Sequence, residues 1–300
     1  MRISGYTYVR NGLKYDYPFL ESIQSVLPIV DEFIVVLGDS TDGSREALQN
    51  LKSDKIKIID TVWDMNLRAG GKLFAQQSTI GAEAATGDWV LHVQADEVIH
   101  EKDILKLKEY IVGHDKNKKV DGLLLPFLNF RGDFQHIQTG RRVHRFEVRA
   151  FRNTGLVYAY KDSQGFRKYS SKEAYVNGEV GEKLNVIKTD IPVYHYSFVR
   201  PPEKMKEKAA FFTQFFFEEN DPRLQVAMKK VEEFDYNEID KLEFFPGTHP
   251  NVMSEIISRK DWAFEYDPTK CKSPLRHKIL NKIEAWTGYR IGEYKNYKLI

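Results

Sequence analysis

The first hundred residues alternate between short apolar runs and segments whose apolar residues recur at helical spacing. Residues 3–9 and 33–37 are apolar runs with the length of a buried strand, and residues 19–27 between them have the spacing of one helix face. A helical segment followed by a strand occurs twice more. These two strands are expected from Ile56 and over residues 88–93. Four strands separated by helices predict a mainly parallel sheet with helices on both faces.

Acidic residues follow two of these strands at the point where each strand ends. Asp96 and Glu97 come directly after the fourth apolar run, in the stretch VLHVQADEV, and Asp39 and Asp42 lie in the loop after the second run. In a parallel sheet, ligands bind where the loops at the carboxyl ends of the strands converge. Asp96 and Glu97 could instead only cap the next helix. Two acid clusters at strand ends favour a ligand site.

The charge balance and the cysteine content restrict the partners and the location. The chain has 45 Lys and Arg against 43 Asp and Glu, a net charge of +2, so we expect no nucleic acid partner. The single cysteine, Cys271, cannot form an internal disulfide, and MRISGYTYVRNG lacks the apolar core of a secretory signal. These features indicate a reducing, cytoplasmic location. No stretch approaches the ~20 apolar residues of a membrane span.

Two stretches resemble motifs of a known family. EFIVVLGDSTDGS and, further along, ATGDWVLHVQADEV are similar to the patterns VVDDGSTDGT and A.GDYILFLDADD of family 2 glycosyltransferases with the GT-A fold. The resemblance covers roughly residues 3–100. It implies an α/β fold with a GT-A-like, Rossmann-type nucleotide-binding sheet. It also implies transfer of a sugar from a nucleotide diphosphate donor, such as a UDP- or GDP-sugar.

The same resemblance implies a divalent metal, Mn²⁺ or Mg²⁺, that bridges the donor diphosphate and Asp96. Displacement of a nucleoside diphosphate builds negative charge on the leaving oxygen, and a hard cation held by carboxylate oxygens neutralises that charge. The chain departs from the family pattern at Leu37 and Gly38, where the family carries two acids, and at Gln94, which replaces the first acid of the second motif. Because Mg²⁺ commonly takes only one or two protein carboxylates, Asp96 is a sufficient acidic ligand.

The region after residue 100 is expected to carry the acceptor side and the catalytic base. Residues 120–160 are typical of further strands that extend the sheet. The base of the resembled family is usually an acid in a short ED or HE motif, which does not occur here. The corresponding stretch KDSQGF offers Asp162, which could equally be a solvated loop acid, and the nearby competitors are Glu173, Glu179 and Glu182.

The stretch IPVYHYSFVRPPEKM resembles the family's strand that ends in a histidine facing the diphosphate and the metal. His195 would then be a metal or phosphate ligand, and Arg200 would neutralise phosphate charge. Both could equally be ordinary residues, His195 as a half-buried residue of the strand. The complete donor-binding set that we expect is Tyr8, Arg10, Asp39, Asp42, Lys72, Gln94, Ala95 and Arg200.

A basic cluster lies near the expected acceptor side. Its members are Arg141, Arg142, His144 and Arg145. Arginine pairs well with carboxylates and phosphates, so the cluster could hold an anionic acceptor. It could also line a solvated strand, which is the interpretation that we favour.

The character of the sequence changes near residue 200. Residues 1–200 are expected to form the catalytic domain, with a nucleotide-sugar half over 1–100 and an acceptor-side half over 101–200. Long amphipathic segments follow, which predict a mostly α-helical C-terminal extension over 201–300.

The helix expected over residues 274–286 has an apolar face with basic residues around it. The residues on that face are Leu275, Ile279, Leu280, Ile283 and Trp286. Such a face usually docks on the protein core, and this is the interpretation that we favour. The alternative is peripheral contact with an anionic membrane that carries a lipid-linked acceptor.

The leading functional hypothesis is a metal-dependent, inverting glycosyltransferase of the hexosyltransferase type. It would move a sugar to the hydroxyl of a saccharide or lipid-linked acceptor in polysaccharide biosynthesis, in the cytoplasm or at the inner face of the membrane. One alternative is a sugar-phosphate nucleotidyltransferase, which normally has a basic, Gly-rich N-terminal loop, whereas only Arg10 and Lys14 stand near that position here. The other is a catalytically weak nucleotide-sugar-binding module, in which Gln94 reflects lost catalysis.

Overall fold

The computed structural model describes residues 1–162, 165–270 and 273–300. Its central sheet begins with the parallel strands β1 (Ile3–Val9), β2 (Glu32–Leu37), β3 (Ile56–Asp60) and β4 (Trp89–His92), in the spatial order β3-β2-β1-β4. The sequence prediction of four parallel strands is confirmed. The strand order reverses between β1 and β4, and the carboxyl ends at such a reversal are where open α/β sheets bind ligands.

Helices cover both faces of these strands because buried apolar side chains project from both faces. One set packs with α1 (Phe19–Val26), α2 (Ser44–Gln49) and α4 (Glu101–His114). The other set, which includes Ile34 and Val36, packs against α3 (Lys72–Ala84). Strands that are buried on both faces read as continuous apolar runs, as the sequence does here.

The second half of the chain extends the sheet with strands of both directions. These strands are β5 (Glu97–Ile99), β6 (Gly122–Arg131), β7 (His136–Gln138), β8 (Phe146–Arg152), β9 (Val157–Tyr160), β10 (Gly165–Lys168), β11 (Glu182–Lys188) and β12 (Val193–Phe198), with the short helix α5 (Lys172–Val176) between β10 and β11. Strand β8 lies antiparallel between β4 and β6. The long strand β6 pairs with β8 and β11 near its start and with β12 near its end, so it joins the main sheet to a second group of strands.

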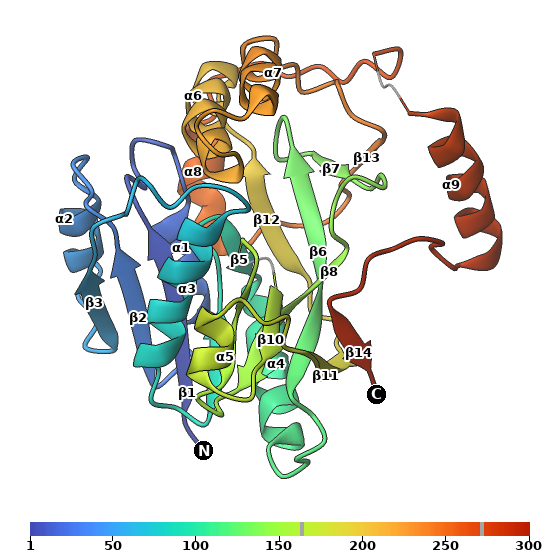
Figure 1. Cartoon of the computed structure of the whole chain (residues 1–300). Helices are drawn as coiled ribbons and strands as arrows, with labels where there is room; N and C mark the ends of the chain where they lie inside the picture. Colours follow the sequence, from blue (N-terminus) through green and yellow to red (C-terminus); the bar gives the residue numbers. More distant parts are fainter. Residues whose placement is uncertain (163–164, 271–272) are drawn as a thin grey trace.

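The part after residue 200 contains helices and two short strands. Its elements are α6 (Pro202–Thr213), the 3₁₀ helix η1 (Gln214–Phe216), α7 (Pro222–Glu232), β13 (Leu242–Phe244), the 3₁₀ helix η2 (Asn251–Met253), α8 (Ser254–Ser258), α9 (Leu275–Thr287) and β14 (Tyr297–Leu299). Strand β13 pairs with β7, and β14 pairs with β11. Helices α6 and α7 lie at the top of the molecule in Figure 1.

Helix α9 lies at one edge of the molecule, apart from the other helices (Figure 1). The expectation that its apolar face docks on the core is wrong for three of the five residues of that face, Leu275, Ile279 and Trp286. The exposed fractions are 74% for Leu275, 51% for Ile279 and 89% for Trp286. The inward side instead carries Glu284, whose carboxylate binds Arg141 at 2.7 Å and Arg145 at 3.0 Å. These ion pairs join the helix to the rest of the chain, and Leu280 and Ile283 on the same helix are half-buried.

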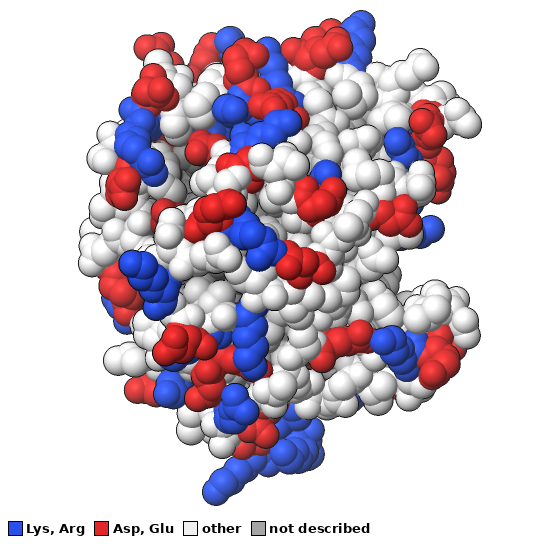
Figure 2. All heavy atoms as spheres, turned by 90° about the vertical axis from the view of Figure 1, so that its left-hand side faces the viewer, with Lys and Arg blue, Asp and Glu red and all other residues white. Residues whose placement is uncertain are grey.

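The surface carries no dominant charge on the face that Figure 2 shows. Lys and Arg side chains alternate there with Asp and Glu, as expected for a net charge of +2. Among the helices of the described residues, none is long and apolar enough to cross a membrane.

Candidate active site

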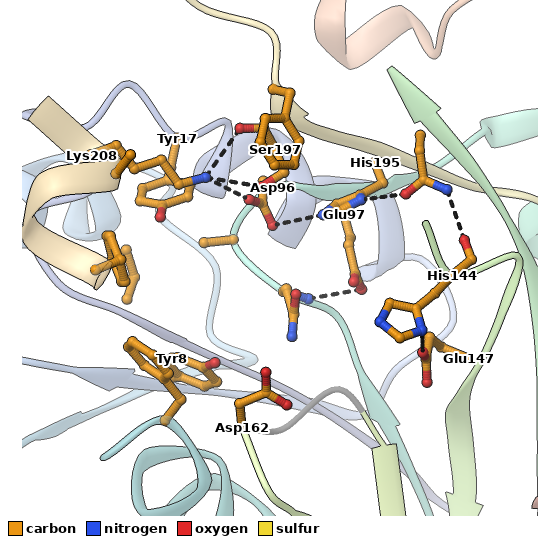
Figure 3. Close-up of a pocket in the computed structure, with 18 of the residues that line it drawn as sticks. Tyr8, Tyr17, Asp96, Glu97, His144, Glu147, Asp162, His195, Ser197 and Lys208 are labelled. Atoms are coloured by element: carbon orange, nitrogen blue, oxygen red, sulfur yellow. Dashed lines mark hydrogen bonds and ion pairs between the residues drawn. The ribbon is translucent and has the colours of Figure 1, made fainter. Parts of the chain in front are cut away.

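A cavity of about 510 Å³ lies at the carboxyl ends of β1 and β4. Its walls come from the ends of these strands, from β6, β8 and β12, and from α6 (Figure 3). Asp96 and Glu97 line it, where the strand-end argument placed them. Asp162 and His195, from the second half of the chain, line the same cavity.

The pairing of three strands brings His195 next to Asp96. In β12, His195 lies opposite Glu97 of β5 and beside Asn129 of β6. The Tyr196 amide donates to the Asp96 carbonyl at 2.8 Å, which fixes the loop after β4 against β12. As a result, His195 Nε2 lies 3.7 Å from Asp96 Oδ1.

A lysine of α6 binds the other oxygen of the same carboxylate. Lys208 Nζ lies 3.3 Å from Asp96 Oδ2 and donates to the carbonyl and the hydroxyl of Ser197 at 3.1 and 3.0 Å. The ammonium also lies 4.5 Å from the centre of the Tyr17 ring. Sequence reasoning missed this residue. The sequence does contain a signal for it: Lys208 lies on the same face of α6 as Met205 and Phe212, and all three residues line the cavity.

These contacts set the charges of the three groups. Burial alone would raise the pKa of the Asp96 carboxyl, but Lys208, His195 and Arg200 outweigh burial and lower it to about 2. Burial, together with the nearby Arg200, lowers the pKa of Lys208 to about 7 in spite of Asp96. Burial likewise lowers the pKa of His195, although Asp96 opposes the shift. Asp96 is therefore ionised at neutral pH, and His195 is neutral.

The hydrogen bonds of Asn129 determine which nitrogen of His195 carries the proton. Asn129 Nδ2 donates to the carbonyl of His144 at 2.8 Å, so its Oδ1 faces His195 Nδ1 at 2.9 Å and accepts a hydrogen bond from it. The proton of neutral His195 therefore sits on Nδ1, and Nε2 turns its lone pair toward Asp96 Oδ1. Two acceptors facing each other at 3.7 Å form a position that favours a cation.

The neighbouring acid, Glu97, has a different environment. Its carboxylate accepts two hydrogen bonds from Arg149, from Nε at 2.7 Å and from Nη2 at 2.6 Å, and a third from the Gln94 amide at 3.1 Å. Both side chains are almost completely buried. Glu97 thus holds β5 to β8, whereas Asp96 turns toward His195 and Lys208.

A second acid, Glu147 of β8, also lines the cavity. His144 Nδ1 lies 3.2 Å from Glu147 Oε1. Burial raises the pKa of Glu147 to about 8; Arg149 opposes this shift, and Glu97 and Asp162 add to it. Sequence reasoning did not single out Glu147, because it stands inside an alternating strand and no motif marks it.

Five of the expected donor residues line one of two neighbouring cavities. Tyr8, Arg10, Gln94 and Ala95 line the cavity together with Asp96. Asp39 lines a neighbouring cavity of about 540 Å³ at the ends of β2 and β3. Two hydrogen bonds of 2.9 Å join Asp39 to Arg10, so this ion pair connects the two cavities.

Three residues expected to bind the donor, and the three glutamates considered as alternatives to Asp162 for the catalytic base, line neither cavity. Asp42 accepts from the Lys14 amide and the Ser44 hydroxyl, both at 2.7 Å, and so joins the loop before α2 to the segment after β1. Arg200 is fully buried behind the cavity wall and donates to the Ser197 carbonyl. The others, which are exposed and line neither cavity, are Lys72, Glu173, Glu179 and Glu182.

Of the basic cluster, only part faces the cavity. Arg142 and His144 line it. Arg141 and Arg145 point away from the cavity. Both bind Glu284 of α9, and Arg145 also binds Glu293, which lies between α9 and β14.

Few side chains in the cavity could act as metal ligands. Over residues 1–162, 165–270 and 273–300, no group of three or more His, Cys, Asp and Glu side chains is arranged to hold an ion. Asp96 and His195 form a pair of potential ligands, and water and substrate phosphate oxygens commonly complete the coordination of Mg²⁺ when proteins supply few ligands.

Comparison with known proteins identifies the family. The model of the family described as glycosyl transferase family 2 matches residues 14–174, more than half of the chain. A search of curated proteins finds no significant match. Similar solved structures include S. aureus TarS 1-349, with 19% identity, a TM-score of 0.39, and coverage of 77% of this chain and 72% of that chain.

Two further structures show the range of the similarity. S. aureus TarS 1-349 in complex with UDP-GlcNAc has 15% identity and a TM-score of 0.38, over 77% of this chain and 72% of that chain. The 4-diphosphocytidyl-2C-methyl-D-erythritolsynthase from Anaerococcus prevotii has 12% identity and a TM-score of 0.37, over 77% and 96%. The family match, the strand order and the strand-end site agree, and the chain belongs to glycosyl transferase family 2, the nucleotide-sugar glycosyltransferases with a GT-A fold.

Proposed function

We propose that the protein is a metal-dependent, inverting hexosyltransferase that moves a sugar from a nucleotide diphosphate to the hydroxyl of a saccharide or lipid-linked acceptor. The observation that carries this proposal is the ionised Asp96 carboxylate at the end of β4, which faces the Nε2 lone pair of His195 inside the cavity. Such a pair suits a cation that accompanies a diphosphate.

The two connected cavities suit the two parts of a nucleotide-sugar. We place the nucleoside toward Asp39 at the ends of β2 and β3, and the diphosphate and sugar toward Asp96 in the larger cavity. Arg10 contributes to both because it lines the larger cavity and binds Asp39. Its guanidinium then lies where the nucleoside and the diphosphate meet.

Asp96 and His195 would hold the metal, Mn²⁺ or Mg²⁺. The residues fit such an ion because one is an ionised carboxylate and the other is a neutral imidazole whose Nε2 lone pair is directed by Asn129. The bound ion would neutralise charge on the departing diphosphate. Lys208 holds Asp96 Oδ2, so Oδ1 is the oxygen that faces His195, and its ammonium adds positive charge to the same side of the cavity.

The acids across the cavity support an inverting displacement. In Figure 3, Asp162 and Glu147 lie on the side of the cavity away from Asp96. A base on that side can take the proton of an acceptor hydroxyl while the diphosphate leaves on the Asp96 side. One in-line displacement of this kind inverts the configuration of the sugar carbon.

We also propose that α9 contacts an anionic membrane that carries a lipid-linked acceptor, at its cytoplasmic face. Leu275, Ile279 and Trp286 project outward, and the exposed basic residues around them are Arg276, Lys278 and Lys282. Apolar side chains with a basic fringe suit an anionic lipid surface. The ion pairs of Glu284 join this helix to Arg141 and Arg145, the neighbours of cavity residues Arg142 and His144.

The test is release of nucleoside diphosphate from a panel of UDP-, GDP-, CDP- and dTDP-sugars with Mn²⁺ and with EDTA. Wild-type protein should release the diphosphate from one nucleotide class with Mn²⁺, and Asp96→Asn should abolish release while its melting temperature shows a folded protein. Binding of a donor without any release, under all conditions, would favour the binding-module alternative.

A further inference from the structure

His144 and Glu147 form a pair at the acceptor-side wall of the cavity. Their Nδ1 and Oε1 atoms lie 3.2 Å apart, and Figure 3 shows the interaction. The ring turns its other nitrogen away from Glu147 and toward the part of the cavity where Asp162 lies (Figure 3). The His144 side chain is 53% exposed and that of Glu147 12%. The imidazole is therefore accessible to a substrate, and the carboxylate behind it is not.

The backbone that carries this pair is tied to the metal side of the cavity. Asn129 Nδ2 donates to the His144 carbonyl, and Asn129 Oδ1 accepts from His195 Nδ1. On the outer side, the adjacent Arg145 binds Glu284 and Glu293. One asparagine thus sets the spacing between His144 and His195.

The surroundings of Glu147 make the pair a good proton acceptor. The charged and titratable groups around it are Arg149 on the same strand, Glu97 on β5, Asp162 after β9, Tyr297 on β14 and His144. Burial comes first among the causes that raise the pKa of Glu147 to about 8. Because Nδ1 of His144 lies 3.2 Å from Oε1 of Glu147, a proton held by one group changes the charge that the other faces, and a base that titrates near the working pH is an efficient one.

We propose that His144 Nε2 takes the proton from the acceptor hydroxyl and that Glu147 positions the ring and stabilises the imidazolium that forms. This inference deepens the proposed function and rests on it. The acceptor oxygen forms a bond to the anomeric carbon as the bond from that carbon to the diphosphate oxygen breaks. The electron pair of the broken bond leaves with the nucleoside diphosphate, and the acceptor proton goes to His144.

The role previously expected for Asp162 changes under this inference. Asp162 lines the same cavity, and its charge is one of the causes that raise the pKa of Glu147. It therefore strengthens the basicity of the pair, and its own contribution to the rate should be the smaller one.

The experiment measures hydrolysis of the accepted nucleotide-sugar with water as the acceptor, because the same base would activate water. Diphosphate release is followed from pH 6 to pH 9 for the wild type, His144→Gln, Glu147→Gln and Asp162→Asn. His136→Gln is the matched control. His136 also pairs with a carboxylate three residues away, since its Nδ1 lies 2.8 Å from Asp133 Oδ1, but it lies outside the cavity. Donor affinity is measured in parallel by calorimetry.

The wild-type rate should rise with pH through about 8, since the base must lose its proton to act. His144→Gln should lower kcat by ~10²-fold or more with donor affinity unchanged. Glu147→Gln still offers Nδ1–H an acceptor oxygen but removes the charge, so kcat should fall and the inflection at about 8 should be lost. The control should match the wild type.

Two results would overturn the inference, and they are distinguishable from failure of the proposed function. An unchanged rate and pH profile in His144→Gln would exclude the pair as the base. Loss of kcat in Asp162→Asn alone would assign the base to Asp162. If wild-type protein released no diphosphate from any donor, the proposed function would fail first, whatever the variants did.

Discussion

Replacement of Arg149 by Met should destabilise the protein because it leaves Glu97 buried without its partner. The Glu97 side chain has no exposed surface and that of Arg149 has 3%. Two hydrogen bonds of 2.6 and 2.7 Å join them, and in the variant only the Gln94 amide would remain. Removing one partner of a buried ion pair typically costs about 3–5 kcal/mol.

Urea unfolding followed by circular dichroism measures this loss. The double variant Arg149→Met with Glu97→Gln should recover much of it, because no uncompensated charge then stays buried. Lys106→Met, which breaks an exposed ion pair with Asp190, is the control and should leave the midpoint nearly unchanged. A loss below about 1 kcal/mol in Arg149→Met, or no recovery in the double variant, would refute the assignment of Glu97 as a structural acid.

Three further predictions follow from the site and from α9. Asn129→Leu removes the acceptor that directs the Nε2 lone pair of His195, and should weaken Mn²⁺-dependent donor binding by about 10- to 100-fold in calorimetry. Glu147 contributes stability that is lost as pH rises from about 4.5 to about 8, because folded Glu147 keeps a proton that unfolded Glu147 releases; the melting temperature of Glu147→Gln relative to that of the wild type should therefore rise with pH over that range. Ile279→Ser with Trp286→Ser should reduce sedimentation with vesicles rich in phosphatidylglycerol, and equal sedimentation of the wild type and the variant would contradict the membrane contact.

The first half of the fold could be predicted because its signals are local. Continuous apolar runs for β1, β2 and β4 alternate with helical spacing, and this pattern requires a parallel sheet with two covered faces. The place of Asp96 at the cavity followed from the same reasoning, since the carboxyl ends of such strands form the ligand site.

The second half depends on contacts between distant segments, which periodicity does not encode. His195 approaches Asp96 only because β12 pairs with both β5 and β6 in one register. Lys208 reaches Asp96 because α6 folds back over the cavity, across a sequence separation that no motif marks. Glu147 owes its proton affinity to burial among Arg149, Glu97 and Asp162, which come from separate elements.

Helix α9 shows a different limit of sequence reasoning. Its apolar stripe predicts burial, and in most helices such a stripe meets the core. Here Glu284 on the opposite side pairs with Arg141 and Arg145, so the helix is oriented with its apolar stripe outward. The amphipathic pattern is the same in either orientation, and it does not encode the ion pairs with Arg141 and Arg145.

The central claim is that Asp96 and His195 together hold a metal for the donor diphosphate. The most direct measurement is calorimetric titration of the accepted nucleotide-sugar into wild type, Asp96→Asn, His195→Ala and the control His136→Gln, each with Mn²⁺ and with EDTA. We predict that Mn²⁺ strengthens binding in the wild type and the control, that the gain is lost in Asp96→Asn and reduced in His195→Ala, and that the variants bind like the wild type in EDTA. Equal wild-type affinity with Mn²⁺ and with EDTA, or an equal loss in His195→Ala under both conditions, would contradict the claim.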